Sequence, residues 1–227
     1  MLKDFFSLVY PHLCCACNKP LYKYENLICT YCRFHLPKTN FHRDLDNPVS
    51  MQLWGKAPVY SAAAFYFFTK GGKVQQLLHN LKYNGKKELG YEIGKLYGLE
   101  LKSAPLFNNV ECVIPVPLHQ IKLKKRGYNQ SDFFADGLAE SLQIPSHKEI
   151  LFRAKATSTQ TKKSAFERWL NVDSIFKLRN ENKIEGKHIL LVDDVITTGS
   201  TFESCASALL SVPGTKVSVA AIAVAKK

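Results

Sequence analysis

The sequence predicts an α/β protein with an open, mainly parallel sheet, helices on both faces of the sheet, and a small cysteine-rich module at the N-terminus. Short apolar runs rich in β-branched residues alternate with helical patterns, which is typical of a right-handed parallel sheet. Four of the seven cysteines fall in two CxxC pairs within the first 35 residues. We therefore expect three parts: an N-terminal helix and metal module at 1–35, a connector at 36–56 and the α/β domain at 57–227.

The elements of the α/β domain follow from hydrophobic periodicity. An amphipathic helix is expected before the cysteines, at 2–10. Strands are expected at 57–68, 110–116, 150–152, 175–176, 189–192 and 215–224. Helices are expected around 74–81, 89–101, 133–142 and 202–209.

Composition limits the class of protein. Hydrophobic residues make up 46% of the chain and charged residues 22%, as in soluble globular proteins. No apolar run reaches the roughly 20 residues of a membrane span, and the first five residues do not fit a signal peptide, so a cytoplasmic location is expected. The net charge of +12 favours polyanionic partners such as nucleic acid, nucleotides or an anionic substrate.

The cysteines follow the pattern C-x2-C-x11-C-x2-C, and the expected metal ligands are Cys14, Cys17, Cys29 and Cys32. Two CxxC turns can each present two thiolates to one tetrahedral Zn²⁺, which would make a closed, structural site. Cys15 remains an alternative to Cys14, and His12 and His35 are flanking alternatives. A redox-active CxxC is a further alternative, whereas structural disulfides are rare in cytosolic proteins.

A second pattern follows the apolar run 189–192, where two acids precede a loop of small hydroxyl residues and a helix. Successive backbone amides and the helix dipole make such a turn an anion cradle. The acids repel phosphate, so we expect them to accept hydrogen bonds from vicinal sugar hydroxyls or to share a Mg²⁺ ion. The residues expected to bind a phosphorylated sugar are Asp193, Asp194, Val195, Thr197, Thr198, Gly199, Ser200 and Thr201. The alternative is an ordinary strand-to-helix turn with two solvated acids.

A basic segment follows the strand at 110–116, and its cations are Lys122, Lys124, Lys125 and Arg126. We expect a loop there, at the functional edge of the sheet, holding a pyrophosphate group or contacting nucleic acid. Lys82, in the basic turn 82–87, is a weaker candidate for the same role. The polar stretch from Arg153 to Ser164 lacks a core period, and we expect it to act as a lid through Arg153, Thr157 and Gln160. No G-x-x-x-x-G-K-[ST] motif occurs, which argues against an ATP-driven motor.

The loop at 193–201 resembles the phosphoribosyl pyrophosphate (PRPP) loop of type I phosphoribosyltransferases, and the whole chain resembles the ComF family of competence-associated proteins. The matching pieces are both CxxC pairs, Leu81-Lys82-Tyr83 with Gly85, Ile114-Pro115-Val116-Pro117, Arg126-Gly127-Tyr128-Asn129-Gln130, the string Arg153/Thr157/Gln160/Arg168/Asn171, Val192-Asp193-Asp194-Val195 and Thr197-Thr198-Gly199. Two positions depart from the family pattern: Lys124 replaces a usual Arg, and Lys163 replaces a usual Leu.

The resemblance implies a type I phosphoribosyltransferase fold with an N-terminal zinc module, PRPP as ligand with Mg²⁺, and catalytic roles for Asp193 and Asp194. It also implies uptake or processing of single-stranded DNA together with a helicase-like partner. Two functions remain open at this stage: an enzyme that transfers the phosphoribosyl group to an unknown acceptor, or an adaptor that binds single-stranded DNA and uses PRPP only as a regulatory ligand or not at all. A purely structural zinc protein is a third reading.

Overall fold

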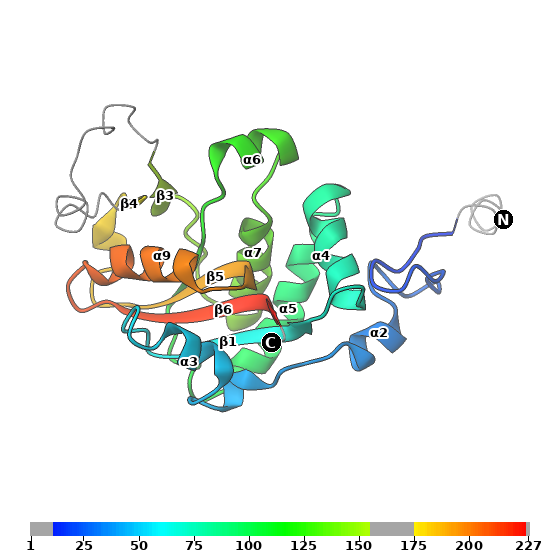
Figure 1. Ribbon diagram of the computed structural model, residues 1–227, viewed down its shortest axis with the longest axis horizontal. Helices are drawn as coiled ribbons and strands as arrows, with labels where there is room; N and C mark the ends of the chain where they lie inside the picture. Colours follow the sequence, from blue (N-terminus) through cyan, green and yellow to red (C-terminus); the bar gives the residue numbers. More distant parts are fainter. Residues whose placement is uncertain (1–10, 155–174, 226–227) are drawn as a thin grey trace.

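A computed structural model describes residues 11–154 and 175–225 of the chain, so the expected helix at 2–10 and most of the expected lid lie outside the described residues. Its main sheet has four strands, all parallel, in the order β1-β6-β5-β2 (Figure 1). The strands are β1 (Ala62–Phe68), β2 (Cys112–Pro115), β5 (His188–Ile196) and β6 (Lys216–Ala225). The prediction of a mainly parallel sheet is confirmed.

Helices cover both faces of this sheet, as predicted. One face carries α4 (Lys73–Tyr83), α5 (Glu88–Lys102) and α7 (Gln130–Leu142), and the other carries α3 (Pro48–Leu53) and α9 (Ser200–Leu210). Alternate residues of β5 enter the two cores: Leu190 and Val192 face α4, α5 and α7, while Ile189 and Leu191 face α3 and α9. This burial on both faces explains the continuous apolar run in the sequence.

Strand β5 extends four residues further than its apolar run. The sequence predicted an end at Val192, but Asp193 pairs with Ala221, and the pairing with β6 continues to Ile196 opposite Val224. The neighbouring strand supplies backbone partners for the acidic residues, so their charge does not end the strand. As a result, Asp193 and Asp194 sit on a rigid strand at the carboxyl edge of the sheet.

Close helix packing fixes α7 against α5. A Cβ atom on Gly137 would lie 2.1 Å from the carbonyl oxygen of Tyr91, and one on Gly94 would lie 2.4 Å from that of Phe134. Only glycine permits two backbones to approach so closely. This contact holds the first turn of α7 beside the carboxyl end of β5.

The expectation of a loop at the basic segment was wrong. The basic segment is a helix, α6 (Gln120–Arg126), capped by the His119 side chain and ended by Gly127 at φ 82°. The expected connector at 36–56 contains a 3-10 helix, η1 (Phe41–Arg43), as well as α3, and both contact β1. Short helices of one or two turns have too little periodicity to be detected in a sequence.

The remaining strands and turn lie outside the main sheet. β3 (Leu151–Arg153) and β4 (Phe176–Leu178) pair antiparallel in a separate two-stranded sheet, and η2 (Glu181–Lys183) precedes β5. The strands expected at 150–152 and 175–176 therefore exist but do not extend the parallel sheet.

The N-terminal module packs against the α/β domain instead of standing apart from it. It contains α2 (Thr30–His35), and its buried residues belong to the same core as α4 and α5. Asn80 Nδ2 donates to the Cys15 carbonyl oxygen at 2.8 Å, and Arg33 forms an ion pair with Glu92 at 3.4 Å. Within the described ranges, no helix combines the length and apolar character needed to cross a membrane.

Candidate functional site

The main cavity lies at the carboxyl edge of the sheet and has a volume of about 510 Å³. Its walls come from the end of α4, the segment after β2, α6, the first turn of α7, β3 and the end of β5. Five Lys or Arg side chains and two carboxylates are among the lining residues. They are Lys82, Lys122, Lys125, Arg126 and Arg153, with Asp193 and Asp194. A cavity whose lining combines two acids with excess positive charge suits a polyanion that also carries hydroxyl groups.

Lys82 and Asp194 form the closest charge pair of the cavity. Lys82 lies in the last turn of α4, and its Nζ is 2.8 Å from Asp194 Oδ2. Asp194 is buried, with 6% of the residue exposed, and Lys82 is the partner of its Oδ2. A carboxylate oxygen has two lone pairs, so Oδ2 can accept a further hydrogen bond from a ligand.

Ser131 holds the other carboxylate. Its fully buried hydroxyl donates to Asp193 Oδ1 at 2.7 Å, and the backbone N–H of Asp194 donates to the same oxygen at 2.8 Å. Burial raises the pKa of Asp193 to about 7, and the neighbouring charge of Asp194 raises it as well, whereas Ser131, the Asp194 amide and Lys82 lower it. Near neutral pH the Asp193 carboxyl group is therefore partly protonated.

The turn between α6 and α7 is fastened to the end of β2. Asn129 caps α7 by accepting from the Ser131 amide, while its Nδ2 donates to the Val116 carbonyl at 3.1 Å. Gly127 adopts the left-handed conformation that ends α6. The motif Arg126–Gln130 therefore builds a sharp corner that brings α6 over the cavity.

Arg126 is oriented by its neighbours on this corner. Its Nη1 donates to Gln130 Oε1, and its guanidinium lies over the Tyr83 ring at 5.6 Å from the centroid. The Tyr128 hydroxyl donates to the Leu81 carbonyl, which ties the corner to α4. Lys122 and Lys125 also line the cavity, but Lys124 is not among the lining residues.

The hydroxyl-rich loop joins β5 to α9 beside the acidic pair. Gly199 caps α9 with φ +81°, and Thr198 Oγ1 and Ser200 Oγ lie 3.1 Å apart. Thr201 lines the cavity together with the acids, whereas Val195, Thr197, Thr198, Gly199 and Ser200 do not. The amides of Thr198 and Gly199 have no acceptor among the described residues, so they are available to an anion.

Arg153, at the end of β3, is the described residue of the expected lid, and it lines the cavity. Thr157 and Gln160 lie outside the described residues.

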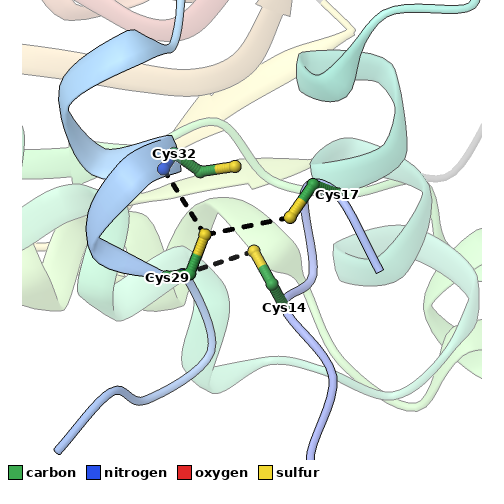
Figure 2. A group of neighbouring side chains, drawn as sticks. All are labelled: Cys14, Cys17, Cys29 and Cys32. Carbon is green, nitrogen blue, oxygen red and sulfur yellow. Dashed lines mark hydrogen bonds between the residues drawn. The ribbon is translucent and has the colours of Figure 1, made fainter. Parts of the chain in front are cut away.

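The four predicted metal ligands form one cluster, shown in Figure 2. The sulfur atoms of Cys14, Cys17, Cys29 and Cys32 all lie within 4.8 Å of one another. A tetrahedral zinc site with Zn–S bonds of about 2.3 Å has sulfur atoms about 3.8 Å apart. The Cys17 and Cys29 sulfurs are 3.8 Å apart, so the donor set fits a tetrahedral metal.

The pKa shifts in this cluster are those of crowded, buried thiols. Burial raises the pKa of Cys29 and Cys32. For Cys14, burial raises the pKa but backbone amides, led by that of Cys29, lower it to a net value of about 7. Four adjacent thiolates are stable only with a bound positive ion. Cys15 is buried outside the cluster, and neither His12 nor His35 belongs to it, which resolves the alternatives that the spacing left open.

The fold and the site define a phosphoribosyltransferase-like protein. Residues 81–227 match the profile of the Phosphoribosyl transferase domain family, and this range is more than half of the chain. The chain belongs to this family.

The curated relatives extend the match beyond residues 81–227 and confirm the ComF resemblance. The chain is 31% identical over 222 residues to the DNA utilization protein YhgH of Shigella flexneri, covering 89% of this chain and 92% of the relative. It is 34% identical over 137 residues to Competence protein F of Haemophilus influenzae, covering 59% and 60%. It is 38% identical over 98 residues to Competence protein ComFC of Bacillus subtilis, covering 43% and 38%.

Solved structures show more distant similarity. The glutamine PRPP amidotransferase from B. subtilis aligns with a TM-score of 0.46 and 20% identity, over 64% of this chain and 30% of that chain. An adenine phosphoribosyltransferase aligns with a TM-score of 0.40 and 14% identity, over 66% and 74%.

Several residues of the site were not predicted from the sequence. Ser131 and Gln130 occupy the first turn of α7, where a sequence pattern shows only helix-starting polar residues. His119 lines the cavity, and its Nδ1 accepts from the Ile121 amide at 3.2 Å. The contact of Lys82 with Asp194 joins residues 112 positions apart, which no local pattern can reveal.

Proposed function

We propose that the chain binds PRPP in the main cavity. The observation that supports this proposal most is the ion pair of Lys82 with the buried Asp194, whose carboxylate can accept further hydrogen bonds. A ligand with two vicinal hydroxyls can donate to the acidic pair, and its phosphate can be bound by the free loop amides and the hydroxyls of residues 197–201. The pyrophosphate would contact Lys122, Lys125 and Arg126, with Lys82 next to the sugar.

The proposed reaction is displacement of pyrophosphate from the anomeric carbon by an acceptor that is not identified. The bond from that carbon to the pyrophosphate oxygen breaks, and the bond to the acceptor forms. Asp193 and Asp194 would hold the ribose while positive charge develops on the sugar, and the cations of α6 would stabilise the departing pyrophosphate. Arg153 lines the cavity, where it can contact the ligand.

Mg²⁺ fits beside the acidic pair, since the two cavity-lining carboxylates offer oxygen ligands of the kind that this ion takes. Asp193 and Asp194 would hold it through bound water or directly. When bound with PRPP, it would neutralise part of the pyrophosphate charge.

The cysteine cluster is proposed to hold a structural Zn²⁺. All four donors are sulfur, which leaves no open position for a substrate and makes the site a closed one. Because the module shares a core with α4, the metal would also stabilise the helix that carries Lys82.

The relatives named for DNA utilization and competence support a role in uptake or processing of single-stranded DNA, with a helicase-like protein as a further proposed partner.

The described structure adds one observation in favour of a second candidate function, a non-catalytic adaptor. Helix α6 has no buried residue and carries four cations beside Ile121, which is 72% exposed. Such a helix can follow a phosphate backbone in a salt-dependent manner.

One experiment separates the two functions. The protein is incubated with PRPP, Mg²⁺ and labelled pyrophosphate in the presence of a panel of nucleobases and amines, and exchange of label into PRPP is measured. Exchange that disappears in the Asp193→Asn, Asp194→Asn variant supports the enzyme. Salt-sensitive binding of single-stranded DNA that survives in this variant, with no exchange in the wild type, supports the adaptor. Absence of PRPP binding by calorimetry refutes the proposed ligand.

A further inference from the structure

We infer that helix α3 and the turn that follows it, in the segment expected to be a connector, position the phosphate-binding loop through Gln52 on the helix and Lys56 in the turn. This inference rests on the proposed function, because it concerns the loop that would bind the sugar phosphate. Gln52 Nε2 donates to the carbonyl oxygen of Thr197, and Lys56 Nζ donates to that of Thr198 at 2.8 Å. The two donors come from a segment about 140 positions away in the chain, so the contacts exist only in the folded protein.

The two contacts determine the direction of the loop amides. In a trans peptide the carbonyl and the following N–H point in opposite directions. A Thr197 carbonyl turned toward Gln52 therefore turns the Thr198 N–H away from α3, and a Thr198 carbonyl turned toward Lys56 does the same for the Gly199 N–H. These amides have no acceptor among the described residues, as expected for donors that are kept for a ligand.

Helix α3 is itself held rigidly, which a positioning element requires. The Asn47 side chain caps it by accepting from the amides of Val49 and Ser50, at 2.9 and 3.2 Å. Asn47 Nδ2 also donates to the Ala62 carbonyl of β1 at 2.8 Å, and the residue is 1% exposed. The helix is thus fixed to the sheet edge before its last turn reaches the loop.

A third contact brings the loop directly onto α3. A Cβ atom on Gly199 would lie 2.9 Å from Cδ2 of Leu53, a residue that is 1% exposed. The loop therefore packs on α3 at the one position without a side chain. Leu53 sets the distance, while Gln52 and Lys56 set the orientation of the two peptide groups.

Charge separates the roles of the two donors. Lys56 also adds positive charge near the proposed phosphate site, whereas Gln52 can act only through its hydrogen bond. Replacing Gln52 with Leu removes the donor and keeps the size of the side chain. Replacing Lys56 with Gln keeps a donor without the charge, and Lys56→Met removes both.

The test uses the full-length protein with its metal, and ribose 5-phosphate and pyrophosphate as separate probes in the presence of Mg²⁺. Calorimetry is expected to show that the Gln52→Leu, Lys56→Met variant binds ribose 5-phosphate about tenfold more weakly, as for the loss of two hydrogen bonds that orient donors. Pyrophosphate, which would bind at the α6 end, is expected to keep its affinity. The matched control is Lys216→Met, which removes the same charge at the start of β6, where the strands of the sheet have their amino ends.

The outcomes are distinguishable. Unchanged ribose 5-phosphate binding in the double variant refutes the inference and leaves the proposed function intact. An equal loss for both probes refutes it too, because the role would then be general stability. If Lys56→Gln behaves like wild type while Lys56→Met does not, the hydrogen bond is the cause. If the wild type binds neither ribose 5-phosphate nor PRPP, the proposed function fails and the inference fails with it.

Discussion

Replacing Lys82 with Met is expected to destabilise the protein in a pH-dependent way. The substitution keeps the aliphatic stem but leaves Asp194, whose side chain is 9% exposed, without its partner charge. Breaking a fully buried ion pair costs about 3–5 kcal/mol, and an exposed one about 0–1 kcal/mol. The Lys82 side chain is 23% exposed, so the pair lies between these limits and we expect a loss of about 2 kcal/mol.

The pH dependence follows from Asp193. Its pKa is raised to about 7 in the folded protein, so ionisation of this group reduces stability as the pH rises from its ordinary value of 3.8 through 7. Lys82 lowers this pKa, and its removal therefore raises it further and extends the loss of stability to higher pH. The Lys82→Met variant is expected to be closest to wild type at pH 5.5 and furthest from it at pH 8.5.

Urea unfolding at both pH values measures this effect, with Asp194→Asn and the double variant completing a double-mutant cycle. Once Asp194 is neutral, Lys82 can turn toward solvent, so the double variant is expected to be about as stable as Asp194→Asn alone. The coupling energy is then about 1–2 kcal/mol. Additive effects of the two substitutions, or the same loss at pH 5.5 and 8.5, would refute the reasoning.

Two further predictions follow from the acidic pair and the cysteine cluster. Binding of ribose 5-phosphate is expected to strengthen as the pH rises through about 7, because an ionised Asp193 carboxylate accepts stronger hydrogen bonds than the protonated acid. Calorimetry of wild type and Asp193→Asn at the same pH values corrects for titration of the ligand, and parallel curves for the two proteins would contradict the prediction. Removal of the metal by a strong chelator is expected to expose the four clustered thiols to a thiol reagent and to lower the unfolding temperature, since buried Cys14 and Cys32 belong to the core shared with α4. The affinity for PRPP should remain measurable. Thiols that react equally before and after chelation would show that no metal was bound.

The sequence by itself determined the class of fold and the chemistry of two sites. The run Ile189–Val192 is apolar at every position, which requires a strand covered on both faces, and the structure buries its alternate residues in two cores. The two CxxC pairs bring four sulfurs within reach of one metal, because a CxxC turn is a local structure whose geometry depends on few neighbours. The order of acids, hydroxyl residues and helix at 193–201 is likewise a local pattern.

Only the tertiary structure decided which side chains hold the acidic pair and the neighbouring loop in place. Ser131, Lys82 and Gln52 reach Asp193, Asp194 and Thr197 from three separate helices, across sequence separations of 62, 112 and 145 residues. Such contacts depend on how α3, α4 and α7 pack on the sheet, and periodicity reports only that each helix has a buried face. The segment expected to be a basic loop is helix α6 in the structure. Three of its four cations line the cavity, whereas Lys124 does not.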